Sequence, residues 1–592
     1  MKNIKYLIIV FAVLAMGCTS VLDKEPQDKI SDTAVWSDEA LADAYLTNVY
    51  SSVNFRSLAG GNIGIGLIAG MGGEMTNFAP WQQPNKAIAT PMNSEKLYGP
   101  LNYWKYDLIR KINIFIEEVT NSEFDEETYK TPRIAEARWI RAYVYFEMVK
   151  RFGGVPIITK AQALDTPKEE LFVSRNTEQE VYDFIDAELT QVFNDLPDQY
   201  SGDLGRITKW AAKAMQSRSN MFAASIARFG SVQLDGVVGI PANLEMAYWQ
   251  KSYDASKILL EQSPHRLYRK YSDPVKNYSQ LFIDEIETNP EIIFTERYDA
   301  ASDMGHSQAL LAVHADFATS WNSNFRPYLD IVEKFEFIDG SSGEIPRTEY
   351  AAKEWSMDEL FHNRDPRFKA SILYNGAEMG WKANNYDSNI AYYHERSLVN
   401  GEWTKKGILP NGMPAKATNR SYEPRPKPLR HGFLLLKFLD QSAGKQEIAK
   451  ESSTDFPIFR LGETYLNFAE AAFYLGNEGE ALDAINELRD RAGMPYKTSI
   501  DEETIRNERA VELVFEEHRF WDIRRWRIAE EVIGGKMMVG LKFDYNYDTG
   551  KFIIKVANAD SVVHEFESQH YYFPLTLSKL SDNPNLVENP GY

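Results

Sequence analysis

Pairs of helical segments recur along most of this chain, and this repetition limits the folds open to it more than any other feature. The clearest pair covers residues 458–475 and 478–492, with a Gly-Asn turn between them. The stretch from Leu461 to Met494 is 34 residues long, the length of one tetratricopeptide unit, although it matches that consensus only loosely. Such hairpins bury their apolar faces only by stacking on one another. The sequence therefore predicts a mainly α fold with a tetratricopeptide-like scaffold of helical hairpins.

Six further segments have apolar residues at helical spacing, and two of them carry clear boundary signals. Thr177 is followed by Glu180 at capping-box spacing, which predicts the start of a helix. Gly153 and Gly154 predict the end of the helix before them. The six predicted helices cover residues 37–53, 101–119, 133–152, 178–196, 208–227 and 244–262.

The helical periodicity breaks down in two places, where Gly, Asn, Pro and aromatic residues are frequent. These are residues 54–100 and residues 265–455, and the second contains short strand-like runs at 291–296 and 433–438. Long irregular segments inside a compact fold are commonly functional, so we expect a loop-rich ligand-binding half there. The predicted regions are a helical scaffold with an N-terminal binding loop at 37–264, the ligand-binding region at 265–455, and a C-terminal helical region at 456–592.

The first 17 residues have the parts of a lipoprotein signal peptide. Two lysines precede an apolar run from Tyr6 to Met16, and Gly17 precedes the chain's single cysteine, Cys18. This run of 11 residues is too short to span a bilayer and has the length of a signal-peptide core. The pattern predicts cleavage before Cys18, lipidation of that cysteine and a membrane anchor, with residues 18–36 as a tether. A conventional secretory signal with an incidental cysteine is the alternative.

Charge and sequence motifs argue against two classes of ligand, nucleic acids and dinucleotide cofactors. The formal net charge of −20 argues against a nucleic-acid partner, because such proteins neutralise phosphates with basic side chains. Aromatic residues make up 13% of the chain and could either fill a core or offer flat surfaces to ligands. The run from Gly64 to Ala69 fits the GxGxxA fingerprint, but no strand pattern precedes it, so we predict no dinucleotide cofactor.

The densest cluster of potentially catalytic side chains is EEHRFWDIRRW, residues 516–526. On one helix, residues three positions apart are neighbours, so each acid should face a base. The expected contacts are Glu516–Arg519, Arg519–Asp522 and Asp522–Arg525. His518 has no second histidine or cysteine at metal-ligand spacing. We therefore interpret the segment as a structural ion-pair network, and we predict no catalytic site and no metal. A carboxylate pair of the glycoside-hydrolase kind stays an alternative, because 85 acidic residues offer many pairs.

Nine segments spread over nearly the whole chain share motifs with one protein family. They are CTSVLDKEPQDKISDTAVW (18–36), AEARWIRAYVYFEMVKRFGGVPII (135–158), GRITKWAAKAM (205–215), NPEIIFTERY (289–298), RDPRFKASIL (364–373), FPIFRLGETYLNFAEAAFYLG (456–476), ALDAINELRDRAGMP (481–495), IRNERAVELVFEEHRFWDIRRW (505–526) and FPLTLSKLSDNPNLVENPGY (573–592). In this order they resemble the SusD/RagB family of Bacteroidetes outer-membrane lipoproteins. The resemblance implies a helical repeat scaffold that carries an irregular ligand-binding half.

The resemblance also implies a non-catalytic binding protein on the cell surface. Such a protein lies over a SusC-like TonB-dependent barrel, captures oligosaccharide and delivers it for import. Sugar rings present apolar C–H faces that stack on Trp and Tyr, and their hydroxyl groups bind amide, carboxylate and guanidinium partners. Some family members take up oligopeptides, so peptide import is a second possibility. The sequence does not identify the glycan.

The ligand residues of the family vary with the glycan, so the candidate contacts rest mainly on position. The segment TNFAPWQQPN resembles the family's binding loop in position, and there we predict Trp81 as a stacking platform with Asn77 and Gln82 as hydroxyl partners. The segment TSWNSNFRPY supplies Trp321 and Asn324 as a second set. Further aromatic candidates are Trp381, Tyr386 and Trp403. Burial in the core is the alternative for all of these tryptophans, and it is the expectation for the helical Trp104, Trp139 and Trp521.

Overall fold

The computed structural model describes residues 32–55, 67–77, 97, 101–163, 165–200, 202, 204–312, 324–378, 390–391, 396–404, 432–440, 452–560 and 563–592. The predicted signal peptide, Cys18 and most of the predicted tether lie outside these residues. Within the described ranges, none of the helices combines the length and the apolar character needed to cross a bilayer.

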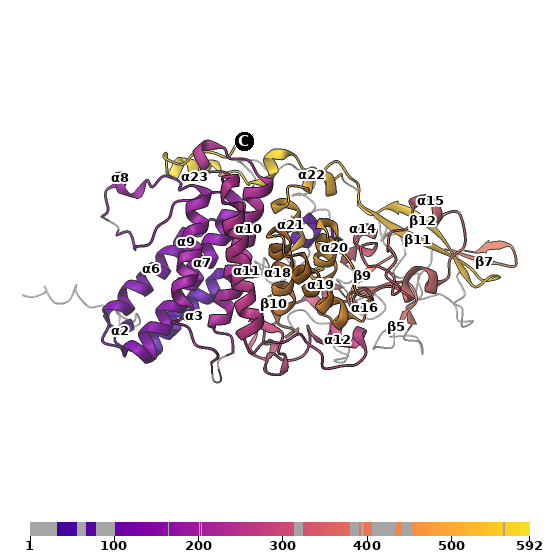
Figure 1. Ribbon diagram of the computed structural model, residues 1–592, viewed down its shortest axis with the longest axis horizontal. Coiled ribbons are helices and arrows are strands. Elements are labelled where there is room, and N and C mark those ends of the chain that lie inside the picture. The colour runs from indigo at the N-terminus through magenta and orange to yellow at the C-terminus, as the bar shows by residue number, and fades with distance from the viewer. Residues whose placement is uncertain are drawn as a thin grey trace, which may run out of the picture.

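The N-terminal half is a stack of helices in which each long helix packs against the next (Figure 1). Its members are α3 (Glu39–Val53), α6 (Tyr106–Asn121), α7 (Thr131–Phe152), α9 (Glu178–Val192), α10 (Lys209–Phe229) and α11 (Glu245–Gln262). Helix α11 also packs against α18 (Leu461–Tyr474), which contacts α19 (Glu478–Ala492) and α20 (Glu502–Glu512). The C-terminal helices therefore continue the same stack, and the prediction of a mainly α fold built from stacked helical hairpins is confirmed.

Local signals account for several helix ends. The Thr177 Oγ1 accepts a hydrogen bond from the Glu180 N–H at 3.1 Å, and the Glu180 carboxylate accepts one from the Thr177 N–H at 2.8 Å. This is the predicted capping box at the start of α9. Helix α7 ends at Phe152, and Gly153 directly after it has φ of +76°. The next residue must also be glycine, because a Cβ on Gly154 would lie 1.9 Å from the Asn176 carbonyl oxygen.

Short strands join the irregular part of the chain to its C-terminal part. Strand β2 (Ile292–Glu296) pairs antiparallel with β10 (Phe456–Arg460). A four-stranded sheet has the order β12 (Lys551–Asn558), β11 (Val539–Asn546), β7 (Ser397–Val399) and β8 (Glu402–Thr404), with β7 parallel to β11. The remaining strands are β1 (Met75–Asn77), β3 (Phe325–Pro327), β4 (Ile372–Leu373), β5 (Ala377–Glu378), β6 (Ile390–Ala391) and β9 (Leu434–Leu435).

The other α-helices in the described part of the chain are short. They are α2 (Asp32–Val35), α4 (Leu67–Met71), α8 (Lys168–Leu171), α12 (Pro274–Gln280), α13 (Gln308–Ala312), α14 (Leu329–Val332), α15 (Arg347–Tyr350), α16 (Pro366–Ser371), α21 (Arg519–Arg525), α22 (Ala529–Val532) and α23 (Leu577–Asp582).

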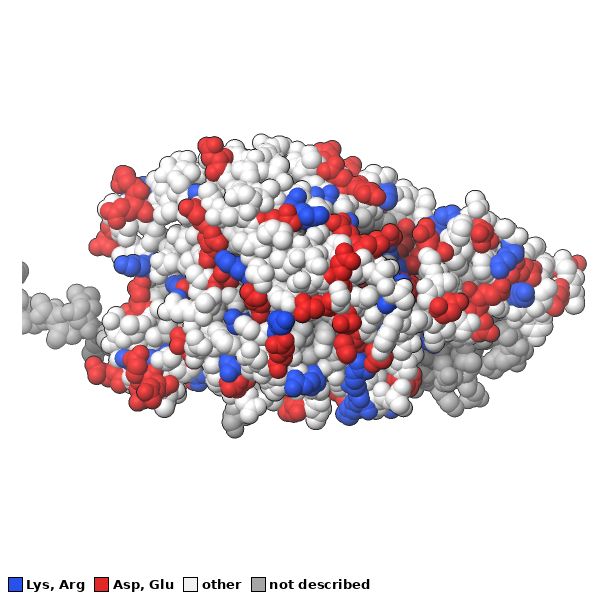
Figure 2. Space-filling view, viewed as in Figure 1, with Lys and Arg blue, Asp and Glu red and all other residues white. Residues whose placement is uncertain are grey.

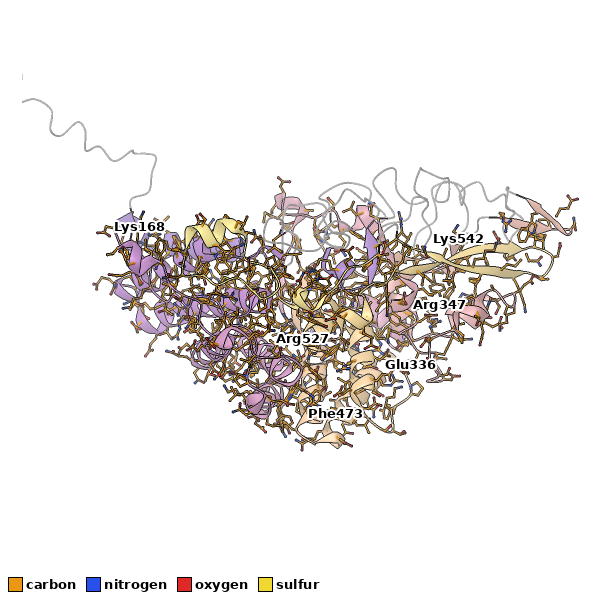
Figure 3. All side chains as sticks on the ribbon, turned by 90° about the horizontal axis from the view of Figure 1, so that it is seen from above. Lys168, Glu336, Arg347, Phe473, Arg527 and Lys542 are labelled. Carbon is orange, nitrogen blue, oxygen red and sulfur yellow. The ribbon has the colours of Figure 1, made fainter. Side chains whose placement is uncertain are left out.

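Two main hydrophobic cores correspond to the helical and the strand-rich halves. The first lies within the helix stack and contains the fully buried Trp139. The second contains Phe361, Phe368 and Phe543 from the strand-rich half. Seen from above in Figure 3, Lys168 lies at the helical end and Lys542 in the strand-rich half. On the face in Figure 2, acidic and basic side chains are interspersed, and acidic ones are the more frequent.

Three predicted helix boundaries are wrong. The helix expected at 178–196 ends at Val192. The helix expected to start at residue 101 begins at Tyr106, after a short irregular stretch. The helix expected at 458–475 begins at Leu461, because Ile458 and its neighbours belong to strand β10 and pair with β2. Their partner strand lies more than 150 residues earlier in the chain, so local periodicity carries no trace of it. The predicted burial is confirmed for Trp139 and Trp521, whereas Trp104 is only partly buried against the first core.

Candidate functional site

The pairing of β1 with β3 brings together the two segments that carry the main candidate ligand residues. The strands are antiparallel, and Asn77, the last residue of β1, lies opposite Phe325, the first residue of β3. The segment that follows Asn77 and the segment that precedes Phe325 therefore meet this two-stranded ribbon at the same end. Trp81, Gln82 and Trp321 lie in those segments, outside the described residues, and Asn77 is placed by its backbone alone.

Asn324 closes the base of the second segment. Its backbone N–H donates to the Leu311 carbonyl oxygen at 2.9 Å, so the residues on either side of 313–323 lie next to each other at the end of α13. The Asn324 residue is 9% exposed. The backbone hydrogen bond to Leu311 holds Asn324 in place beside α13. The predicted contact of Asn324 with a ligand stays a prediction.

The other aromatic candidates belong to hairpins further along the strand-rich half. Strands β5 and β6 pair antiparallel and enclose residues 379–389, where Trp381 and Tyr386 lie outside the described residues. Trp403 lies on β8 and is 44% exposed. The guanidinium carbon of Arg396 is 4.4 Å from the centroid of the Trp403 ring, which covers one face of the indole with a cation.

The segment 516–526 is not one continuous helix. Helix α20 ends at Glu512 and α21 begins at Arg519, and between them Phe515 and Glu517 have φ of 61° and 65°. These left-handed residues turn the chain between Glu516 and Arg519, so the predicted contact of those two residues is wrong. Arg519 and Asp522 do share α21, but the predicted contact between them is also wrong, because the Asp522 carboxylate is bound by Arg509 and Arg525. The expected contact of Asp522 with Arg525 is present at 2.9 Å.

The acids of this region are engaged by buried bases from distant parts of the chain. The Arg460 guanidinium contacts Glu516 at 2.7 Å, Glu512 at 2.7 Å and Glu291 at 2.8 Å. Further contacts to the same cluster come from Lys437 to Glu516 at 2.7 Å, Arg367 to Glu512 at 3.0 Å and Arg491 to Glu291 at 2.8 Å. Burial by itself raises the pKa of Glu512, but three neighbouring arginines outweigh it and hold that pKa well below its usual range. The interpretation of this region as a structural ion-pair network is therefore confirmed, with different partners from those predicted.

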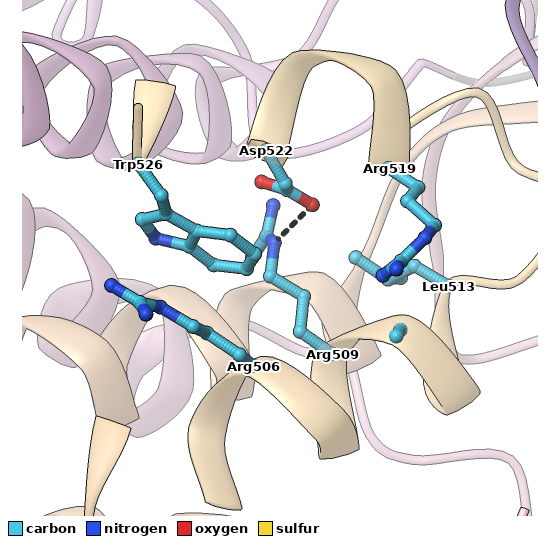
Figure 4. Close-up of a pocket in the computed structure, with 7 residues that line it drawn as sticks. Arg506, Arg509, Leu513, Arg519, Asp522 and Trp526 are labelled. Carbon is cyan, nitrogen blue, oxygen red and sulfur yellow. Dashed lines mark hydrogen bonds and ion pairs between the residues drawn. The ribbon is translucent and has the colours of Figure 1, made fainter. Parts of the chain in front are cut away.

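Two cavities lined by described residues are each too small to hold a sugar ring. One recess is lined by Arg506, Arg509, Ala510, Leu513, Arg519, Asp522 and Trp526 (Figure 4), and it leaves no space for a water molecule. A second cavity of about 40 Å³, beside residues 281–286 and 453–457, has room for only a few water molecules. Among the described residues, no group of three His, Cys, Asp or Glu side chains could hold a metal ion. Burial and nearby arginines lower the pKa of His518 well below its usual value, so its imidazole is neutral.

Glu74 is a residue at this site that the sequence analysis missed. It is fully buried immediately before β1, and one of its carboxylate oxygens accepts a hydrogen bond from the Phe515 N–H at 2.9 Å. A carboxylate inside the Gly- and Met-rich run GMGGEM was the available signal, because a buried acid must find a partner from elsewhere in the fold.

Comparison with known proteins gives matches over most of the chain. A profile described as the SusD family matches residues 290–592, and one described as starch-binding associating with outer membrane matches residues 21–221. A SusD-like protein of Bacteroides ovatus is 26% identical over 550 residues, which cover 89% of this chain and 83% of the relative. The starch-binding protein SusD of Bacteroides thetaiotaomicron is 24% identical over 514 residues, which cover 82% of this chain and 77% of the relative.

A crystal structure of a SusD-like protein from Bacteroides fragilis has the same fold. It superposes with a TM-score of 0.72 at 24% identity, and the match covers 96% of this chain and 100% of that one. The family profile alone covers slightly more than half of the sequence, including the whole C-terminal helical region and the strands that pair with it. The chain therefore belongs to the SusD family.

Proposed function

We propose that this protein captures oligosaccharides at the outer face of the outer membrane and passes them to a SusC-like TonB-dependent transporter. Family membership supports a role in carbohydrate binding, because a relative that aligns over 82% of the chain is a starch-binding protein. A lipid on Cys18 would hold the protein at the membrane.

The ligand would lie over the end of the β1–β3 ribbon. In this proposal, the rings of Trp81 and Trp321 stack on sugar rings, and the amides of Asn77, Gln82 and Asn324 bind sugar hydroxyl groups. Trp381 and Tyr386 would extend the surface to further sugar units. The single observation that carries the proposal is the register of the ribbon, in which Asn77 lies opposite Phe325. This register brings the starts of two separately predicted segments to one place.

We further propose that the glycan is held without being cleaved. A glycoside hydrolase needs one carboxylic acid that donates a proton and a second carboxylate nearby. The buried acids around Arg460 are instead each in contact with guanidinium groups. At Glu512 and Glu516 these basic neighbours lower the pKa of the carboxyl group, so it stays ionised and cannot donate a proton.

Electrophoresis through native gels that contain single polysaccharides tests the proposal. Starch, laminarin and other soluble glycans would be compared, and reducing ends would be measured after incubation with each. We expect at least one glycan to retard the protein, with no increase in reducing ends. Release of reducing ends would identify a hydrolase. Retardation by no glycan, together with binding of an oligopeptide mixture, would favour peptide import.

Anchoring and partnership need a separate experiment in the native host. A Cys18→Ser variant should lose its lipid and leave the membrane fraction. The unaltered protein, solubilised in mild detergent, should copurify with a TonB-dependent barrel. If the Cys18→Ser protein remained in the outer membrane, the proposed anchor would be wrong.

A further inference from the structure

The short segment that leads into β1 is pressed against the start of α21. A Cβ on Gly72 would lie 2.8 Å from the Phe520 backbone nitrogen, so a side chain at this position has no room. Gly73 follows with φ of +74°, a conformation that glycine adopts most readily. Glu74 follows these two residues, and its side-chain carboxylate reaches the turn between α20 and α21.

Glu74 connects three parts of the chain through three hydrogen bonds. Its N–H donates to the Ala69 carbonyl in α4, and its carbonyl accepts from the Tyr328 N–H directly after β3, both at 3.0 Å. Its side-chain Oε1 accepts from the Phe515 N–H at 2.9 Å. Phe515 has a left-handed backbone, so its N–H lies outside the helical hydrogen-bond pattern. The second carboxyl oxygen, Oε2, is buried and has no hydrogen-bond partner.

The charges that face Glu74 come from two elements. Arg519 and Asp522 belong to α21, and Lys437 follows β9. Lys437 is already bound to Glu516 at 2.7 Å, and Asp522 is bound to Arg509 at 2.8 Å and to Arg525 at 2.9 Å. Lys437 and Asp522 are therefore both engaged by partners other than Glu74.

We propose that Glu74 is a positioning residue that fixes the β1–β3 ribbon to the turn between α20 and α21, and that loss of its proton loosens this attachment. For ligand binding, this inference rests on the proposed function, because one predicted ligand segment follows β1 and the other precedes β3. The attachment itself concerns described residues alone.

The direction of the pH effect follows from burial. Burial raises the pKa of Glu74 to about 7, whereas water would return it to the usual value of about 4.5 when the segment opens. Between about pH 4.5 and pH 7, Glu74 is ionised when the ribbon is open and keeps its proton when the ribbon is closed. Opening of the ribbon therefore becomes more favourable as pH rises through this window, and it levels off above about pH 7.

Hydrogen–deuterium exchange of the mature full-length protein tests the attachment without any ligand. The reporters are peptides that contain the amides of Phe515 and Tyr328, with rates corrected for the intrinsic effect of pH. We expect exchange in the unaltered protein to increase by about 10-fold or more from pH 5 to pH 8. Glu74→Gln keeps an oxygen acceptor for Phe515 and cannot ionise, so its exchange should not change with pH. Glu74→Met removes the acceptor, so its exchange should be fast at every pH.

Glu178 supplies the matched control. Glu178 is also fully buried, and one of its carboxylate oxygens has no hydrogen-bond partner. Burial likewise raises the pKa of Glu178 to about 7. It binds Gly239 and Tyr572, away from the ribbon. Glu178→Gln should leave the exchange of the Phe515 and Tyr328 peptides as in the unaltered protein. The inference is overturned if Glu74→Gln keeps the pH dependence, or if Glu178→Gln removes it to the same extent.

Ligand binding is the second readout, with a polysaccharide that retards the unaltered protein in the gel panel as the probe. Its affinity should fall by about 10-fold from pH 5 to pH 8, and it should stay constant in Glu74→Gln. If exchange follows the expectation and affinity does not, Glu74 fixes the ribbon as proposed, and the extension of this inference to the ligand site is overturned. If no polysaccharide is retarded, the proposed function fails, and exchange alone still decides whether Glu74 fixes the ribbon.

Discussion

The Nη1 atom of Arg460 lies 2.7 Å from Oε1 of Glu512, although the two residues are 52 positions apart. Arg460 ends strand β10, and Glu512 ends helix α20. The opposite oxygen of Glu512 accepts from Arg367 of α16 at 3.0 Å. One carboxylate thus joins the helix stack to the strand-rich half, and both of its oxygens are occupied by guanidinium groups.

This contact lies where the two main cores meet. Leu513 packs into the first core, while Val511 and Val514 pack into the second. A buried ion pair is weak support for stability as such, but it fixes relative positions, because a shifted partner leaves a buried charge without compensation. The cluster around Arg460 therefore sets how the helical scaffold and the half with the predicted ligand site are placed relative to each other.

Arg460→Met should destabilise the protein by about 3–5 kcal/mol, because it leaves Glu512 and Glu516 buried with fewer cationic partners. Urea unfolding followed by circular dichroism measures this change. Arg297→Met is the control, since the Arg297 side chain is 43% exposed and its nearest acid is 3.6 Å away. The control should change stability by less than about 1 kcal/mol. Equal effects of the two substitutions would show that the cluster has no special role.

Local signals in the sequence were enough for elements that depend on local contacts. Helix α19 runs from Glu478 to Ala492 as predicted, with acids in its first turn and Gly493 just past its end. The capping box of Thr177 is likewise present. These features lie within a few residues of the boundaries that they set.

Elements whose partners are distant were predicted less well. Strand β10 pairs with β2, and Glu512 and Glu516 bind Arg460, so neither arrangement leaves a signal within one turn of helix. The turn at Phe515 was hidden because a non-glycine residue adopts positive φ there. For the candidate site, the sequence identified the segments that flank β1 and β3, but it could not show that these strands pair, and it gave no role to Glu74.

Gly154→Ala should destabilise the protein strongly, by about 3 kcal/mol or more, because the new Cβ would overlap the Asn176 carbonyl oxygen at 1.9 Å and only a backbone shift could relieve this. The midpoint of thermal unfolding measures the effect. Gly479→Ala is the matched control. Gly479 lies in α19 with open space around it, so alanine should stabilise the helix by about 0.5–1 kcal/mol. A neutral Gly154→Ala variant would contradict the close approach of these two segments.

Glu178→Gln should alter how stability depends on pH. Burial raises the pKa of Glu178 to about 7, so its contribution to folding is fully present below about pH 4.5 and is lost as pH rises through about 7. The substitution should therefore reduce the loss of stability between pH 5 and pH 8 by about 1–3 kcal/mol, measured by urea unfolding at each pH. Glu180→Gln is the control on the same helix. The Thr177 N–H lowers the pKa of Glu180, so that carboxyl stays ionised throughout this pH range. An unchanged pH profile in Glu178→Gln would show that this acid is already ionised at neutral pH.

Trp81→Ala and Trp321→Ala should each weaken the binding of a glycan that retards the unaltered protein, by about 10-fold, because each substitution removes one stacking surface worth about 1–1.5 kcal/mol. Isothermal titration calorimetry with an oligosaccharide of the same linkage measures the affinities. The double substitution should lose about 100-fold if both rings contact neighbouring sugars, since independent contacts add in free energy. Trp403→Ala is the control, because Trp403 is exposed but lies on the separate β7–β8 hairpin with Arg396 over its ring. Unchanged affinity in both single variants would remove the glycan site from the β1–β3 ribbon. If only Trp403→Ala lost affinity, the glycan site would lie on the four-stranded sheet instead.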